Sequence, residues 1–173
     1  LIRCFADAGV PAGVVNLVAA GRDASDHLVR NPGIDKVTFT GSTLAGKRIG
    51  EVCAGRVARC TLELGGKSAA IVRDDFPIEV AAAILGNTIT IMSGQVCAML
   101  SRAIVPRHRH DELADAIAKV MQGIRIGHSD APDTQLGPVA MKRQLERVEE
   151  YVALGRASAD LVTGGGQRLQ VAL

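Results

Sequence analysis

Apolar residues along the chain form two kinds of pattern, short continuous runs and longer stretches with a helical period. The short runs are rich in β-branched residues and are bounded by glycine or proline, which is typical of buried strands. They predict strands at 14–20, 36–40, 60–66, 68–72, 101–107 and 159–166. The helical stretches predict helices at 23–30, 42–54, 76–92, 110–124 and 141–155. Because strands and helices alternate, we expect an α/β fold with a parallel sheet.

The predicted helices differ in how they should meet the core. The stretch 76–92 is apolar over most of its length, so we expect a long buried helix there. The helix at 110–124 is amphipathic. The helix at 42–54 is expected to place one set of apolar side chains on its buried face: Leu44, Ala45, Ile49, Val52 and Cys53.

Composition narrows the class of protein. The chain has 173 residues, of which 47% are hydrophobic and 22% charged, as expected for a globular protein with a real core. A net charge of +2, 2% aromatic residues and no Trp give no basis for a nucleic-acid partner. No apolar run approaches the roughly 20 residues that span a bilayer, so we expect no membrane segment. The N-terminus lacks Met and a basic leader, and we expect the chain to begin inside a larger protein.

The four cysteines do not have the spacing of a zinc site or a disulfide framework. They indicate reduced thiols and hence a cytoplasmic protein. Cys4, Cys53 and Cys60 fall within predicted helices or strands, so we expect them to be core thiols. The "RHRH" stretch at 107–110 is interpreted as a solvated basic cluster rather than a metal site.

A glycine turn follows the predicted strand at 36–40. Gly41 and Gly46, followed by Lys47, nearly form a P-loop, in which backbone N–H groups and a helix N-terminus hold phosphate. A P-loop needs Ser or Thr after the lysine to bind Mg²⁺, and the chain has Arg48 there. The dinucleotide G-x-G-x-x-G pattern is absent as well. Alone, the turn therefore indicates either a phosphate-binding loop of another kind or a purely structural turn.

Two further side chains are candidates for chemistry. Glu63 lies at the end of a predicted strand just before two glycines, where open α/β sheets place ligands, and a carboxylate there can act as a general base. Cys97 lies in a loop between a long apolar helix and a strand, where its thiolate could act as a nucleophile. Taken singly, Glu63 could equally be a surface glutamate and Cys97 a structural thiol.

Taken in order, these stretches resemble a known family. "FTGSTLAGKRIG" (39–50), "LELGGKSAAIV" (62–72) and "GQVCAMLSRAIV" (94–105) resemble the cofactor turn, the general-base motif and the nucleophile motif of the NAD(P)-dependent aldehyde dehydrogenase superfamily. The stretch "AGVPAGVVNLV" (8–18) and the segments between and beyond the motifs are also similar to that family. The resemblance covers nearly the whole chain, and its glutamate and cysteine motifs are highly specific.

The resemblance implies a role for each motif residue. Cys97 would attack the aldehyde carbon, and Glu63 would activate the water that hydrolyses the resulting thioester. The implied cofactor is NAD or NADP, and the implied substrate is a small aldehyde. The residues expected to contact the cofactor or shape its site are Gly41, Ser42, Gly46, Leu64 and Gly65.

The resemblance also implies a domain organisation. Residues 1–65 would be the C-terminal part of a Rossmann-like NAD(P)-binding domain, and residues 66–173 the start of an α/β catalytic domain. The family's second oxyanion donor, its adenine-ribose segment and its nicotinamide-ribose segment would lie outside this chain. We therefore expect a fragment of a homo-oligomeric enzyme, with weak activity or none on its own. The alternatives are a CoA-acylating relative and a non-catalytic interaction module.

Overall fold

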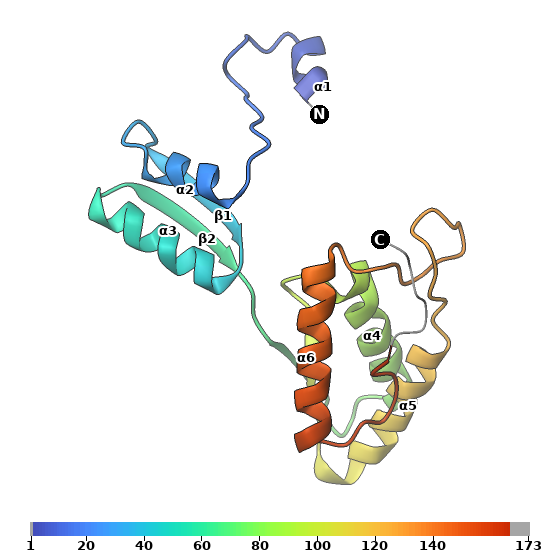
Figure 1. Ribbon diagram of the computed structural model, residues 1–173. Coiled ribbons are helices and arrows are strands. Elements are labelled where there is room, and N and C mark those ends of the chain that lie inside the picture. The colour runs from blue at the N-terminus through green and yellow to red at the C-terminus, as the bar shows by residue number, and fades with distance from the viewer. Residues whose placement is uncertain (1, 167–173) are drawn as a thin grey trace. The chain divides into compact units, whose positions relative to one another are not determined.

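A computed structural model describes residues 2–166 and divides the chain into two compact units, Leu1–Gly65 and Gly66–Leu173. Each unit contains one parallel pair of strands joined through at least one helix (Figure 1). The predicted α/β class with parallel strands is therefore confirmed. The strands form two separate parallel pairs, one in each unit.

The first unit is a strand–helix–strand ribbon preceded by two short helices. Its elements are α1 (Ile2–Asp7), α2 (Arg22–Arg30), β1 (Lys36–Gly41), α3 (Thr43–Gly55) and β2 (Arg59–Leu64). Strands β1 and β2 pair in parallel, with a register that runs from Lys36 opposite Arg59 to Gly41 opposite Leu64. Helix α3 connects the two strands, as parallel pairing requires a crossover, and it packs along one side of them (Figure 1).

The buried face of α3 is formed by Gly46, Ile49 and Cys53, of which Cys53 is fully buried. The prediction for this helix was correct in its limits and in Ile49 and Cys53. It was wrong for Leu44, which is 81% exposed. Leu44 lies in the first turn of the helix, on the side opposite the helical row formed by Gly46, Ile49 and Cys53.

The predicted strand at 14–20 is not formed. These residues have no regular secondary structure, and the exposed fractions of Val14, Leu17 and Val18 are 66%, 76% and 71%. A strand needs a hydrogen-bonded neighbour, and the only neighbour that β1 has among the described residues is β2. The β-branched composition of this segment was therefore not sufficient to make it a strand.

The second unit pairs two strands beneath a helical hairpin. Its elements are β3 (Ser68–Ile71), α4 (Ile78–Thr90), the 3₁₀ turn η1 (Ile91–Gly94), β4 (Leu100–Ile104), the 3₁₀ turn η2 (Arg107–Arg109), α5 (His110–Gln122) and α6 (Lys142–Ser158). Strands β3 and β4 are parallel, with a register shift between Ser68 and Ala69. Helices α4 and α5 run side by side (Figure 1).

The core of this unit is one apolar cluster between α4, α5 and the strands. Its buried members are Val72, Ile78, Ala81, Ala82, Leu85 and Leu113. On α4 the buried positions recur every three or four residues, so this helix is amphipathic rather than buried all round as predicted. Val80 and Ile84, on its other side, are 46% and 48% exposed.

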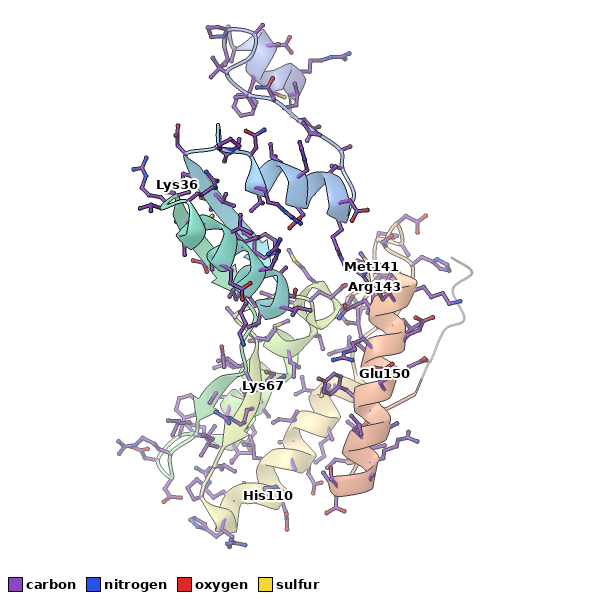
Figure 2. The ribbon with its side chains drawn as sticks, turned by 60° about the vertical axis from the view of Figure 1, so that its left-hand side comes forward. Lys36, Lys67, His110, Met141, Arg143 and Glu150 are labelled. Atoms are coloured by element: carbon purple, nitrogen blue, oxygen red, sulfur yellow. The ribbon has the colours of Figure 1, made fainter. Side chains whose placement is uncertain are left out.

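Helix α6 follows the two-helix hairpin and buries none of its side chains. Its side chains make local ion pairs, including one between Arg147 and Glu150 at 3.2 Å. Figure 2 labels Glu150 on this helix. The strand predicted at 159–166 is not formed, for the same reason as at 14–20: no strand of the described residues pairs with it. No helix of the described residues has the length and apolar character to cross a bilayer.

Candidate active site

The carboxyl end of the β1–β2 ribbon brings together five of the residues singled out from the sequence. Gly41 pairs with Leu64 in the register, and the preceding pair is Thr40 with Glu63. Ser42 and Gly46 begin α3 at the same end of the ribbon. These residues therefore lie together at one end of the ribbon.

Glu63 lies on the face of the ribbon that α3 leaves uncovered. The Cβ positions of Gly46 and Gly50 on α3 face Leu64 and Leu62, so the even-numbered residues of β2 point toward the helix. Alternation then turns Glu63 to the opposite face, beside Thr40. The other side chains of this face are polar and exposed: Lys36, Thr38, Arg59 and Thr61. Within its unit, Glu63 is a solvent-facing carboxylate.

The turn into α3 is organised by a cap and by two close glycine contacts. Ser42 has an extended backbone, and its Oγ accepts a hydrogen bond from the Ala45 N–H at 3.3 Å, which satisfies one free donor of the first turn. A Cβ at Gly41 would lie 2.5 Å from Cζ of Phe39, and one at Gly46 would lie 2.5 Å from Cδ2 of Leu64. A side chain at either position would therefore force Phe39 or Leu64 to move.

The first turn of α3 carries no acidic side chain. Its N–H groups and the positive end of the helix dipole therefore meet no carboxylate from their own helix. Gly41 and Gly65, which flank this end, place no side chain there, and Gly65 has open space around its Cβ position. This combination is compatible with an anionic group such as a pyrophosphate.

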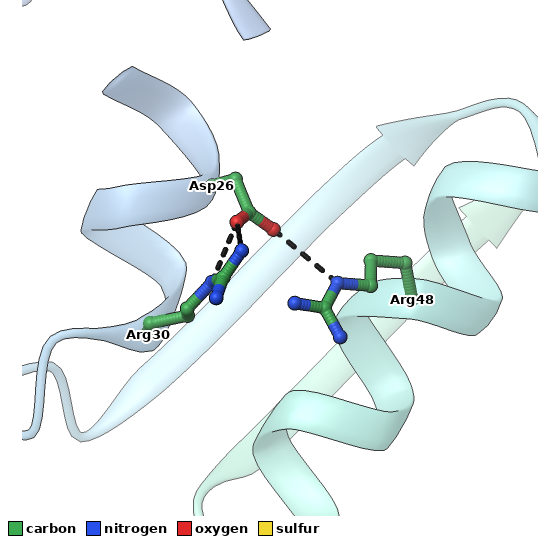
Figure 3. Close-up of polar contacts among 3 residues, drawn as sticks. All are labelled: Asp26, Arg30 and Arg48. Atoms are coloured by element: carbon green, nitrogen blue, oxygen red, sulfur yellow. Dashed lines mark hydrogen bonds and ion pairs between the residues drawn. The ribbon is translucent and has the colours of Figure 1, made fainter. Parts of the chain in front are cut away.

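Arg48, the residue that distinguishes the turn from a P-loop, contacts α2. Asp26 on α2 accepts from Nε of Arg30 at 2.6 Å and also pairs with the Arg30 Nη2, while its second oxygen is 3.4 Å from Nε of Arg48 (Figure 3). The hydrogen bond from Arg30, reinforced by the Arg48 charge, lowers the pKa of Asp26 below its ordinary value. Arg48 thus has a structural partner, and Lys47 beside it is exposed as expected.

Cys97 lies in the second unit, in the turn between η1 and β4, and it is exposed. Just before it, Met92, Ser93 and Gly94 adopt φ angles of 48°, 56° and 77°. Two consecutive non-glycine residues in the left-handed region are unusual, because the Cβ atom approaches the following carbonyl. A strained backbone next to a candidate nucleophile is a typical feature of functional sites.

The strained turn is held by side chains that the sequence did not single out. Ser93 Oγ donates to the Gly137 carbonyl at 2.7 Å. Gln95 donates from Nε2 to the Met92 carbonyl at 3.0 Å, and its Oε1 accepts from the Ala140 N–H at 2.9 Å. The contacts with Gly137 and Ala140 span 44 and 45 residues. The local sequence pattern therefore could not predict them.

The other cysteines are not all core thiols. Cys53 is buried as expected, but Cys4 and Cys60 are exposed, which corrects the prediction for these two. Cys4 lies on α1, which buries no residue. Cys60 is the second residue of β2, and its side chain is exposed as well. All four are free thiols.

The basic stretch at 107–110 is partly structural. Arg109 is only 14% exposed, and its Nη1 donates to the carbonyls of Arg73, Asp74 and Phe76 at 2.8–2.9 Å, which fixes the turn after β3. His108 pairs with Asp74, and His110 pairs with Asp111. Figure 2 labels His110 at the start of α5. No group of three or more potential metal ligands occurs among residues 2–166.

An open hollow of about 520 Å³ lies beside this basic stretch, lined by Val105, Arg107, His110 and Asp111. Cys97 precedes β4 and Val105 follows it, so the hollow is at the opposite end of that strand from the thiol. None of the site residues inferred from the sequence lines it.

Comparison with known proteins identifies the family. The aldehyde dehydrogenase family matches residues 1–172. The chain belongs to the aldehyde dehydrogenase family. It is 42% identical over 170 residues to geranial dehydrogenase of Castellaniella defragrans, covering 98% of this chain and 36% of that protein. It is 36% identical to the α-ketoglutaric semialdehyde dehydrogenase of Bacillus subtilis, covering 98% and 35%. The chain therefore spans about a third of the length of the curated relatives it matches.

Solved structures of aldehyde dehydrogenases share the fold. The Mycobacterium tuberculosis aldehyde dehydrogenase complexed with NAD+ matches with a TM-score of 0.91 and 38% identity, over 97% of this chain and 35% of that one. A cysteine mutant of aldehyde dehydrogenase C from Pseudomonas syringae, in complex with NAD+ and octanal, matches with a TM-score of 0.90 and 36% identity, over 95% and 34%. The resemblance stated from the motifs is thereby confirmed at the level of the family.

Proposed function

We propose that this chain carries the cofactor turn and both catalytic side chains of an aldehyde dehydrogenase that oxidises an aldehyde to a carboxylic acid with NAD or NADP. The observation that carries the proposal is the environment of Cys97 in a chain of this family. The thiol is exposed, and it lies on a strained turn that side-chain hydrogen bonds hold in place. Exposure and a fixed backbone are what an attacking thiolate requires.

In the proposed reaction, the thiolate of Cys97 adds to the aldehyde carbon and forms a C–S bond, while the carbonyl oxygen takes the negative charge. Among the described residues the Cys97 N–H makes no hydrogen bond to another group, so it is available as a donor to that oxygen. When bound, the nicotinamide cofactor accepts a hydride from this carbon. Loss of that hydride leaves a thioester on Cys97.

Glu63 would complete the turnover as general base. It would take a proton from a water molecule that attacks the thioester, which releases the carboxylic acid and regenerates the thiol. Its place at the carboxyl end of β2, on the uncovered face of the ribbon, supports access to water and substrate. Because Glu63 and Cys97 belong to different compact units, their meeting at one site is part of the proposal.

The residues at the start of α3 fit a dinucleotide. The capped N-terminus without acidic side chains would hold the pyrophosphate near Gly41 and Ser42, and Gly46 would allow α3 to pack closely on Leu64. Leu64 and Gly65, at the end of β2, would lie toward the nicotinamide. The NAD+ complexes of the M. tuberculosis and P. syringae relatives support this assignment.

The same proposal implies a domain organisation, a cellular location and an oligomeric state. The unit Leu1–Gly65 would be the end of the cofactor-binding domain, and Gly66–Leu173 the beginning of the catalytic domain. We place the protein in the cytoplasm, where the four free cysteines would stay reduced. The full enzyme is proposed to be a homo-oligomer.

Single-residue variants of the full-length gene product test the roles of the two side chains. With octanal and NAD+, Cys97→Ser is expected to abolish the first turnover of NADH formation, because the nucleophile is lost. Glu63→Gln is expected to keep a rapid first turnover but to lower the steady-state rate about 10²–10⁴-fold, the usual contribution of a general base. The matched controls are Cys60→Ser and Glu51→Gln, which replace an exposed thiol and an exposed carboxylate of the first unit.

The same assay separates the alternatives. Added coenzyme A that restores the steady-state rate of Glu63→Gln to the wild-type level would indicate a CoA-acylating enzyme. A steady-state rate that Glu63→Gln leaves unchanged in the absence of coenzyme A would contradict the base assignment. A full-length wild-type protein that forms no NADH with any aldehyde tested would support the non-catalytic alternative.

A further inference from the structure

The Gln95 side chain joins the Cys97 turn to a distant part of the second unit. Its amide makes two hydrogen bonds in opposite senses, donating to the Met92 carbonyl at 3.0 Å and accepting from the Ala140 N–H at 2.9 Å. The Met92 carbonyl also accepts from the backbone N–H of Gln95 at 3.1 Å. One side chain, two residues before the thiol, thus closes the turn on itself and ties it to the 137–140 segment.

The backbone conformation of residues 92 and 93, which the Gln95 hydrogen bonds enclose, is intrinsically unfavourable. Met92 and Ser93 have left-handed φ angles that side-chain-bearing residues rarely adopt. Met92 is 74% exposed, so packing of its side chain does not impose this conformation. Conformations of this kind persist when the surroundings over-determine them. The hydrogen bonds of Gln95 and Ser93 act on this backbone directly.

The residues directly before the 137–140 segment are anchored. Ile126 and Leu136 form an isolated parallel bridge, and the Gly127 N–H donates to the Leu136 carbonyl at 3.1 Å. The Gln135 N–H donates to the Arg125 carbonyl at 2.9 Å. These bonds hold residues 135 and 136 to the chain that leaves α5. The partners of the Ser93 and Gln95 hydrogen bonds, Gly137 and Ala140, follow directly after these anchored residues.

We propose that Gln95 is a positioning residue that fixes the direction of the Cys97 thiol for attack on the aldehyde, with Ser93 as a second tie to the same segment. This inference rests on the proposed function of Cys97. Gln95 itself touches neither reacting atom. A nucleophile displaced by about 1 Å can lose on the order of 10²-fold in rate, so loosening the turn should slow chemistry without changing cofactor affinity.

The test uses the full-length protein and three variants at position 95. Gln95→Leu removes both side-chain hydrogen bonds at similar size. Gln95→Glu keeps an acceptor for Ala140 but loses the donor to Met92, and Gln95→Asn keeps the amide on a shorter arm. Gln144→Leu, at an exposed glutamine of α6, is the matched control. Ser93→Ala removes the second tie.

Two readouts are measured on each variant. The first is amide hydrogen exchange of the 92–99 peptide, which needs neither aldehyde nor cofactor. The second is the first-turnover rate of NADH formation with octanal, together with the dissociation constant of NAD+. Gln95→Leu is expected to speed exchange and to slow the first turnover by at least ten-fold each, with unchanged NAD+ affinity. Gln95→Glu is expected to show smaller changes in both the exchange rate and the first-turnover rate. Gln144→Leu is expected to match the wild type in both.

The two readouts keep this inference separate from the proposed function. Exchange and first turnover within two-fold of wild type in Gln95→Leu would overturn the positioning role. Faster exchange with an unchanged first-turnover rate would overturn it as well, because the tie would then be only structural. If instead the Cys97→Ser variant has the same first-turnover rate as the wild type, the proposed function is wrong. The exchange readout then still decides whether Gln95 holds the turn.

Discussion

Gly41 and Gly46 flank the start of α3 without a positive φ angle, whereas Met92 and Ser93, before Cys97, have φ angles of 48° and 56°. The first region has glycine where the backbone conformation does not demand it, because a Cβ would collide with Phe39 or Leu64. The second region has left-handed backbone where the chain supplies side-chain-bearing residues. The space around the Cβ position favours glycine in the first region. Hydrogen bonds to distant residues hold the backbone conformation of the second.

The contrast separates two ways of building a site. At the glycine turn, the cap from Ser42 to Ala45 and the contact of Gly46 with Leu64 involve one strand–helix–strand unit. At the cysteine turn, the restraints come from Gly137 and Ala140, more than 40 residues further along the chain. The first region should therefore respond to added volume, and the second to backbone freedom and lost hydrogen bonds.

The largest effect is expected from volume at the glycine turn. Gly46→Ala places a Cβ 2.5 Å from Leu64, and overpacking of this kind costs about 1–3 kcal/mol. Gly50→Ala, one turn later on the same helix, places its Cβ at an ordinary 3.7 Å from Leu62 and should stabilise α3 by up to about 1 kcal/mol. Urea unfolding followed by circular dichroism checks this, and equal midpoints for the two variants would show that space is not the constraint.

A smaller effect of opposite sign is expected at the cysteine turn. Met92→Gly removes a Cβ from a left-handed, 74% exposed position and should stabilise the second unit by about 0.5–1 kcal/mol, after the entropy cost of glycine. Met92→Ala is the control, since it shortens the side chain without relieving the backbone. The measurement is the same urea midpoint. A Met92→Gly midpoint no higher than that of Met92→Ala would mean that the turn is not strained.

The smallest effect is expected from the exposed ion pair that joins α2 to α3. Since the Arg30 hydrogen bond lowers the pKa of folded Asp26, the contribution of this carboxylate is present above its unfolded pKa and is lost as the pH falls through the lower folded value. The stability difference between wild type and Asp26→Asn should therefore be seen near neutral pH and vanish in acid. Asp35→Asn, at another exposed aspartate of the unit, is the control. A pH-independent difference would refute the assignment.

The difference between the regions also explains what the sequence could predict. Helix α3, its start near Ser42 and the two strands that flank it followed from periodicity and turn chemistry, because these depend on neighbouring residues. Helices α5 and α6 were predictable for the same reason. Cys97 was located by its motif and its exposure is observed, but the ties through Ser93 and Gln95 depend on residues far away in the chain.

The wrong predictions have a common physical origin. The segments at 14–20 and 159–166 have strand-like composition, but they have no strand partner among the described residues. Leu44 is apolar, but it lies on the side of α3 opposite the buried row and away from the strands that the helix covers. In each case the outcome depended on which surface was available to pack against, and this information is not contained in local sequence.

The most direct test of the account is a search for the acyl intermediate on Cys97. The full-length Glu63→Gln variant is mixed with octanal and NAD+, quenched in acid, and its cysteine peptides are analysed by mass spectrometry. The account predicts an octanoyl adduct on Cys97 that is absent from Cys4, Cys53 and Cys60 and does not accumulate in the wild type. An NADH burst without an adduct on Cys97, or with the adduct on another cysteine, would contradict it.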